Sequence, residues 1–126
     1  MKVTKTKINA QDKRGLIKDI LVKVPVDAIT YITSKKNAVR GNHLHKLTSQ
    51  YEYVLSGSFL CCTRTGEKGK KKSTILTAGD LALHPPGEQH ALKALENSEL
   101  LSFTYGPRRG MDYEKDTYRL AEPLIT

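Results

Sequence analysis

The chain consists of short runs of apolar and β-branched residues, and turn residues interrupt these runs about every 8–12 positions. No segment keeps an apolar period of about 3.6 residues between helix-capping residues. Because β-branched and aromatic residues favour extended backbone, this cadence is typical of an all-β sandwich or barrel. We therefore expect strands at 16–24, 28–33, 51–55, 59–64, 73–76, 81–84, 90–94 and 100–105.

Length and composition indicate one globular domain covering residues 1–126. The 126 residues are 38% hydrophobic and 27% charged, without a repeat or a low-complexity linker. No apolar stretch approaches the roughly 20 residues of a membrane-spanning helix, and the first residues lack the apolar segment of a signal peptide. We therefore expect no membrane partner and a cytoplasmic location. There the adjacent Cys61 and Cys62 would stay reduced, since neighbouring strand residues point to opposite faces.

The charge of the chain favours an acidic partner. Lys and Arg number 21 against 13 Asp and Glu, a formal charge of +8, and residues 1–72 carry the basic excess. A nucleic acid or a small phosphate-bearing molecule would suit this balance. Because aromatic residues are only 6% and no nucleic-acid-binding motif occurs, we expect no nucleic-acid partner. The lysines between 59–64 and 73–76 are expected to form a solvated hairpin tip: Lys68, Lys70, Lys71 and Lys72.

The four histidines are the main candidate functional residues. His43 and His45 are two positions apart, and in extended backbone such positions share one face. His90 follows a Pro-Gly turn in a second segment. His84 directly precedes a proline, and we expect it to have a structural role.

The spacing of these residues resembles the two motifs of the cupin superfamily. The first motif, G-x5-H-x-H-x(3,4)-E-x6-G, is matched by His43, His45 and Gly57, with Gln50 at the glutamate position. The second motif, G-x5-P-x-G-x2-H-x3-N, is matched by Gly79, Pro85, Gly87 and His90, with Ala94 at the asparagine position. The resemblance implies an all-β double-stranded β-helix, the cupin jelly-roll barrel.

A metal-binding cupin holds Mn, Fe, Ni or Zn with three histidines and one glutamate. The corresponding ligands in this chain would be His43, His45, Gln50 and His90. A glutamine supplies a neutral carbonyl oxygen in place of a carboxylate, which weakens a divalent site. Glu52, two residues further along an extended run, would share the inward face of Gln50 and offer a substitute carboxylate. A metal-dependent dioxygenase or isomerase is therefore one alternative function.

Further segments resemble the nucleotide-sugar 3,4-ketoisomerase family. Residues 12–16 look like its D-x-R-G-x-L opening, residues 40–46 like its R-G-x-H-A-H-K signature, and residues 111–116 like its D-Y-x-x-D tail. That family also carries glutamine at the position of Gln50. The resemblance implies a cofactor-independent isomerase that converts a nucleotide-linked 4-keto-6-deoxyhexose to its 3-keto isomer.

In that reaction a base removes the proton next to the ketone, and a proton returns at the former carbonyl carbon. Imidazole suits both steps because its pKa lies near neutrality. The resemblance implies that the catalytic residues are His43, His45, Tyr31 and Arg40. The residues implied to bind the substrate, a nucleotide-diphosphate sugar, are Arg14, Lys46, Gln50 and His90. It also implies a homodimer whose N-terminal strands exchange or pair.

A non-catalytic cupin that binds a sugar or an effector would carry the same motifs, and is the second alternative. Outside the motifs, Arg108 and Arg109 follow a Gly-Pro turn and are expected to be solvated. The acidic stretch 112–116 would either cap the barrel or pack on a partner subunit.

Overall fold

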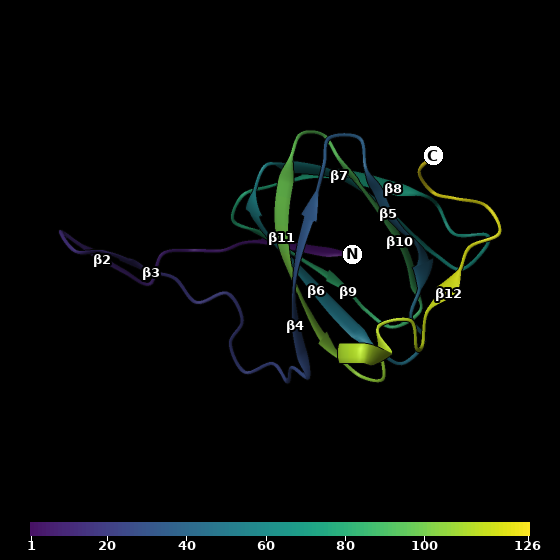
Figure 1. The fold of residues 1–126 in the computed structure, drawn as a ribbon, viewed down its shortest axis with the longest axis horizontal. Helices are drawn as coiled ribbons and strands as arrows, with labels where there is room; N and C mark the ends of the chain where they lie inside the picture. Colours follow the sequence, from purple (N-terminus) through teal and green to yellow (C-terminus); the bar gives the residue numbers. More distant parts are fainter.

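The computed structural model describes residues 1–126 as two antiparallel five-stranded sheets that face each other (Figure 1). The first sheet has the order β1 (Lys2–Lys5), β9 (Asp80–His84), β6 (Ser49–Ser56), β11 (Ser98–Tyr105) and β4 (Ala28–Ser34). The second has the order β12 (Tyr118–Arg119), β5 (Val39–Leu44), β10 (Glu88–Ala94), β7 (Ser58–Thr65) and β8 (Lys72–Thr77). From β4 onward the chain changes sheet at every connection except the β7–β8 hairpin. This arrangement is a jelly roll, so the all-β prediction is confirmed.

The apolar core lies between the two sheets. Its main cluster contains Val54, Phe59, Leu76 and Leu100, each at most 2% exposed. These residues alternate with outward-facing neighbours along their strands, as the period of a β-strand requires. Leu100 also lines the cavity described below, so the core continues into the floor of that cavity.

A second structural feature is a two-stranded hairpin that projects from the barrel. Its strands are β2 (Ala10–Asp12) and β3 (Gly15–Ile17), and all six of their residues are exposed. Figure 1 shows this hairpin, which we call the arm, extending away from the two sheets. Nothing else in the chain packs on β2 or β3 as a strand neighbour.

The strand expected over 16–24 is wrong beyond Ile17. Residues 18–27 form an irregular connection from the arm to β4. Within it, Ile20 and Leu21 obtain their burial by packing against the cluster of Tyr53, Leu81 and Phe103 on the first sheet. The residues of an apolar run can thus be buried by side-chain packing alone, without forming the hydrogen bonds of a sheet.

The other seven predicted runs each lie within or largely overlap an observed strand, and the predicted hairpin of 59–64 with 73–76 is the β7–β8 pair. The expected strands did not include β1, β2, β5 or β12. Cys61 and Cys62 are buried and free, as expected. The only helical element is the 3₁₀ helix η1 (Gly110–Asp112), and no helix in the structure could span a membrane.

The segment after β11 returns across one end of the barrel. It forms η1, and then β12 pairs with β5. Asn42 on β5 holds the final residues, because its Oδ1 accepts hydrogen bonds from the amides of Leu124 and Ile125, and its Nδ2 donates to the Ile125 carbonyl. We call this set of contacts the Asn42 clamp.

Candidate active site

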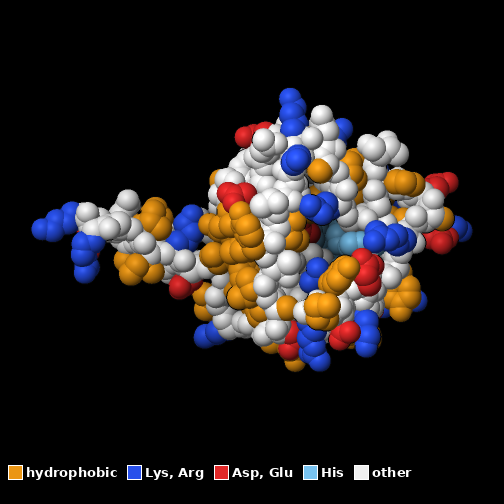
Figure 2. Space-filling view, in the orientation of Figure 1, with side chains coloured by type: hydrophobic (Ala, Val, Ile, Leu, Met, Phe, Trp, Pro, Cys, Tyr) orange, Lys and Arg blue, Asp and Glu red, His pale blue; other side chains and the backbone are white.

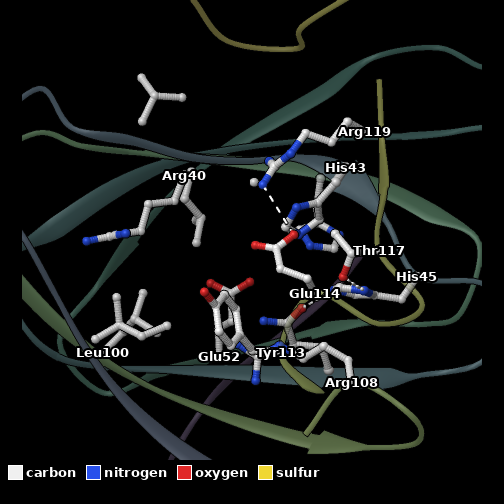
Figure 3. A pocket seen from close by; sticks show the side chains of 16 residues that line it. Arg40, His43, His45, Glu52, Leu100, Arg108, Tyr113, Glu114, Thr117 and Arg119 are labelled. Atoms are coloured by element: carbon white, nitrogen blue, oxygen red, sulfur yellow. Dashed lines mark hydrogen bonds and ion pairs between the residues drawn. The ribbon is translucent and has the colours of Figure 1, made fainter. Parts of the chain in front are cut away.

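A cavity of about 370 Å³ opens between the two sheets at the end of the barrel covered by the returning segment. Strands β5, β10 and β12 supply one wall, and β6 and β11 supply the other. Figure 2 shows histidine atoms in a hollow of the surface, with Lys or Arg side chains beside them. Figure 3 shows most of the polar residues that line this cavity: Arg40, His43, His45, Gln50, Glu52, His90, Arg108, Tyr113, Glu114, Thr117 and Arg119.

Three histidines meet in the cavity. The ring centroids of His43 and His45 lie 4.8 Å apart, and those of His43 and His90 lie 4.7 Å apart. His43 and His90 are direct cross-strand partners on β5 and β10. Their close approach depends on Gly41, whose φ is +88° and where a Cβ would lie 2.8 Å from the His90 carbonyl oxygen. Glycine is the residue that tolerates both conditions.

Gln50 and the backbone fix the orientation of His45. The His45 Nδ1 lies 2.9 Å from the Asp116 carbonyl oxygen, and its Nε2 lies 3.1 Å from Gln50 Oε1. Gln50 in turn donates from Nε2 to Ser102 Oγ on β11 at 2.9 Å. A chain of hydrogen bonds across both sheets therefore holds this imidazole in one position.

Two of the histidines are neutral at physiological pH. Burial, followed by the charge of His45, lowers the pKa of His43 to about 4. Burial, followed by the charge of His84, lowers the pKa of His90 well below its usual value. The His43 Nδ1 and the His90 Nε2 have no hydrogen-bond partner. A neutral imidazole with an unused nitrogen can accept a proton or a hydrogen bond from a ligand.

A buried charge network lies behind the histidines. His84 is 1% exposed and lies between two carboxylates, with Nε2 3.0 Å from Glu52 Oε1 and Nδ1 3.0 Å from Glu88 Oε1. Glu88 also contacts the backbone nitrogen of Met1. Burial alone would lower the pKa of His84, but the charge of Glu52 and the hydrogen bonds to its neighbours outweigh burial and raise it well above the usual value. His84 thus has the structural role expected from the sequence.

These opposite shifts predict that the free energy of unfolding is greatest between about pH 6 and 7. Below about pH 6.5 the histidines of the unfolded chain bind protons, whereas buried His43 and His90 stay neutral in the folded chain, so the free energy of unfolding falls. The lowered pKa of His43 alone accounts for a loss of about 3 kcal/mol by pH 4. Above about pH 6.5 stability falls as the pH rises through the raised pKa of folded His84. Urea unfolding at about pH 4.5, 6.5 and 8.5 measures this curve. Equal stability at the two lower values would contradict the prediction, and His43→Asn should reduce the acid loss.

Arginines form the rim of the cavity. Arg40 donates to Ser34 Oγ at 2.8 Å and to the Thr33 carbonyl at 2.7 Å. Arg119 on β12 is the cross-strand partner of His43 and lies 3.6 Å from the Glu114 carboxylate (Figure 3). The expectation that Arg108 is solvated is wrong, because its half-buried side chain lines the cavity and burial lowers its pKa. Its neighbour Arg109 is exposed and pairs with Asp27 at 2.8 Å.

The acidic stretch 112–116 caps this end of the barrel. Tyr113 and Glu114 line the cavity, and the Asp116 carboxylate accepts hydrogen bonds from the amides of Lys46, Leu47 and Thr48. Burial opposes the ionised form of Asp116, but these hydrogen bonds outweigh it and lower the pKa. These hydrogen bonds hold residues 46–48, which follow the His-x-His pair, against the returning segment.

Three of the residues implied by the family resemblance do not line the cavity of this chain. Tyr31 points outward from β4 and donates a hydrogen bond to the Glu99 carboxylate. Lys46 places its Nζ 4.2 Å from the centre of the Tyr118 ring, outside the cavity. Arg14 lies at the turn of the arm, where its guanidinium contacts Asp12 at 2.7 Å. By contrast, the structure brings together His43, His45, Gln50, His90 and Arg40.

Sequence reasoning did not single out Arg119, Tyr113, Glu114 or Thr117 as cavity residues. All four lie on the returning segment, whose one motif, the D-Y-x-x-D tail at residues 111–116, carried no expectation of a place in the cavity. No periodic pattern in the sequence marks Arg119, which lies on the two-residue strand β12.

Comparison with known proteins identifies the fold of the chain. No protein-family model matches the chain, and no curated protein sequence matches it. Among solved structures, it is similar to QdtA, a sugar 3,4-ketoisomerase from Thermoanaerobacterium thermosaccharolyticum solved with TDP. The identity is 22%, the coverage is 95% of this chain and 88% of that one, and the TM-score is 0.74. The chain has the RmlC-like cupin fold.

Other solved cupins of this kind are similar over most of their length. WlaRA, a TDP-fucose-3,4-ketoisomerase from Campylobacter jejuni, is 18% identical, with 83% of this chain and 81% of that one covered and a TM-score of 0.72. The dTDP-4-dehydrorhamnose 3,5-epimerase from Sulfolobus tokodaii is 22% identical, with 84% and 80% covered and a TM-score of 0.66. The cupin fold that the two motifs implied is therefore confirmed.

Proposed function

We propose that this cupin isomerises a nucleotide-linked 4-keto-6-deoxy sugar to its 3-keto isomer. The observation that carries the proposal is the pair His43 and His45, 4.8 Å apart in a cavity with an arginine rim. Solved structures of similar fold include sugar 3,4-ketoisomerases, one of them in complex with TDP, which supports the same ligand class here.

The reaction needs proton transfer and no net oxidation. One histidine takes the proton from C3, the electrons of that bond form a C3–C4 double bond, and the former carbonyl oxygen gains the negative charge. A histidine then returns a proton to C4 while the hydroxyl proton moves from O3 to O4, which leaves the ketone at C3. An imidazole in the correct position contributes roughly 10²–10⁴-fold to such steps. The proposed reaction requires no cofactor.

The cationic rim suits the diphosphate of the substrate. Arg40, Arg108 and Arg119 line the cavity, and guanidinium groups bind phosphate oxygens through two parallel hydrogen bonds. Gln50 Nε2 donates one of its two hydrogens to Ser102 Oγ, so its second hydrogen is the donor proposed for the enolate oxygen. Gln50, His90 and Arg40 are therefore proposed to contact the substrate, while Lys46 and Tyr31 would do so only if they moved.

The direct test is to incubate the purified protein with dTDP-4-keto-6-deoxyglucose in D₂O. We expect a 3-keto isomer and solvent deuterium at the former carbonyl carbon, detected by NMR spectroscopy and mass spectrometry. If the protein neither exchanges nor isomerises several nucleotide-linked keto sugars but still binds them, it is the non-catalytic binding cupin.

A metal-dependent cupin is the second candidate, because the nitrogens of His43, His45 and His90 lie within 4.8 Å of one another. Bonds of about 2.1 Å to one ion require nitrogen atoms no more than about 4.2 Å apart. Both nitrogens of His45 already have partners, so an ion would have to displace Gln50 from its Nε2. Metal analysis after reconstitution with Mn, Fe, Ni or Zn decides: one equivalent per chain supports this candidate, and a small fraction of an equivalent counts against it.

We further propose that the protein is a homodimer in which the arm packs on the partner. Leu16 and Ile17 are 53% and 65% exposed although both are large and apolar, and the arm has no neighbouring strand in its own chain. Figure 2 shows apolar atoms along the arm and on the adjoining face of the barrel. In a dimer of this kind, Arg14 would reach the partner subunit and could contact a ligand bound there.

We also propose a reducing, cytoplasmic setting for the protein. Cys61 and Cys62 are buried and free, which supports this setting.

The double substitution Leu16→Lys with Ile17→Lys is expected to convert the dimer to a monomer, because it removes apolar contact and adds two like charges per arm. Light scattering should give about twice the chain mass of 14.1 kDa for the wild-type protein and one chain mass for the variant. Ile75→Lys is the control, since Ile75 is 58% exposed on β8 and should leave the dimer intact. A wild-type monomer at micromolar concentration would refute the dimer.

A further inference from the structure

Glu52 is a buried carboxylate that the proposed reaction has not used. It lies on β6, two residues from Gln50, so both side chains project into the cavity from the same face of the strand. Its side chain is 2% exposed. Its Oε1 is paired with His84, whereas its Oε2 is buried without a hydrogen-bond partner.

The position of this carboxylate is fixed from behind. His84 holds Glu52 Oε1 at 3.0 Å and is itself held by Glu88 at 3.0 Å on the opposite side of its ring. Its ring also stacks on His90, with centroids 4.6 Å apart and an interplanar angle of 20°. Glu52 therefore cannot turn its second oxygen toward another protein donor without breaking its contact with His84.

An ionised carboxylate only accepts hydrogen bonds, and a buried acceptor without a donor is unfavourable. A ligand that displaces water from this cavity would therefore have to bring a donor to Glu52 Oε2. Ring hydroxyls are the donors of a sugar. Glu52 lies about 7 Å along β6 from Gln50, which contacts His45, so a ring that reacts near His45 extends over Glu52.

We propose that Glu52 Oε2 accepts a hydrogen bond from a ring hydroxyl of the bound sugar and thereby selects which sugars enter the cavity. This role rests on the nucleotide-sugar ligand of the proposed function. It is a binding role, separate from the proton transfers assigned to the histidines. The cavity then divides into an arginine rim for the diphosphate and a carboxylate floor for the sugar.

The test measures binding without turnover, by calorimetry with dTDP, dTDP-glucose and its 2-deoxy and 3-deoxy analogues. None of these ligands carries a ketone. In the wild-type protein, removal of the contacted hydroxyl should weaken binding by about tenfold to hundredfold, the value of a hydrogen bond to a charged group. Glu52→Gln should reduce that discrimination by about fivefold to tenfold, since a neutral acceptor replaces a charged one, and Glu52→Ala should abolish it.

The affinity for dTDP alone should stay the same in each variant, which shows that the barrel is folded. Glu99→Gln is the matched control, because Glu99 lies on β11 outside the cavity, where it accepts a hydrogen bond from Ser56, and its substitution should keep the wild-type discrimination. The proposal is overturned if the wild-type protein discriminates neither analogue, or if Glu52→Gln keeps the wild-type ratio. The D₂O assay judges the isomerase function separately, so the two failures are distinguishable.

Discussion

His43→Asn and His45→Asn are each expected to lower the rate of isomerisation by about 10²–10⁴-fold. Asparagine keeps a polar side chain of similar reach but does not take up a proton near neutral pH. The expectation rests on the neutral state of His43 and on the fixed orientation of His45 between Gln50 and the Asp116 carbonyl. Rates are to be measured under saturating dTDP-4-keto-6-deoxyglucose, with dTDP affinity confirming a folded cavity.

Deuterium exchange separates the roles of the two histidines. The variant that lacks the base should lose both exchange and product, whereas the variant that lacks only the returning acid should still exchange the proton at C3. Lys70→Ala, at the β7–β8 turn far from the cavity in sequence and sheet position, serves as the unchanged control. If either histidine variant keeps more than about a tenth of the wild-type rate, that histidine is not the base.

His84→Leu is expected to lower the free energy of unfolding by about 3–5 kcal/mol, because it leaves Glu52 and Glu88 as buried carboxylates without their shared cation. The midpoint of thermal unfolding should fall by roughly 10–20 °C for a domain of this size. Denaturant titration and differential scanning calorimetry measure both quantities.

The matched control for this effect neutralises the whole network. A triple variant with Glu52→Gln, His84→Leu and Glu88→Gln should recover most of the lost stability, since replacing a buried ion network is far less costly than breaking it. A loss below about 1 kcal/mol in His84→Leu would show that the carboxylates reach solvent or take up protons instead.

The strand pattern could be predicted from the sequence because each strand is a local run with clear ends. The positions of β6, β7, β10 and β11 follow from such runs. The arm and β12 could not be found in this way, since each is short and polar or exposed. The closure of the two sheets into a barrel could be predicted only from the spacing of the cupin motifs, because that spacing relates residues that are distant in the chain.

Prediction of the site succeeded where spacing determines geometry. His43, His45, Gln50 and His90 meet because two sheets bring β5, β6 and β10 together. The outward direction of Tyr31 was not predictable, because Tyr31 and Ile32 are both apolar enough to face inward and a strand alternates between them. Arg108 and Arg119 were missed because the irregular path of the returning segment, and not any periodic pattern, brings them to the rim.

The Asn42 clamp has a consequence for how the protein is made. Asn42 lies next to His43, but its side chain is satisfied only by Leu124 and Ile125. A ribosome adds roughly 5–20 residues per second from the N-terminal end, so the histidines leave it seconds before their supporting segment. Until residues 117–125 emerge, β5 is an uncovered sheet edge and one wall of the cavity lacks Thr117 and Arg119. The cavity of the nascent chain is therefore completed only when residues 117–125 dock against β5.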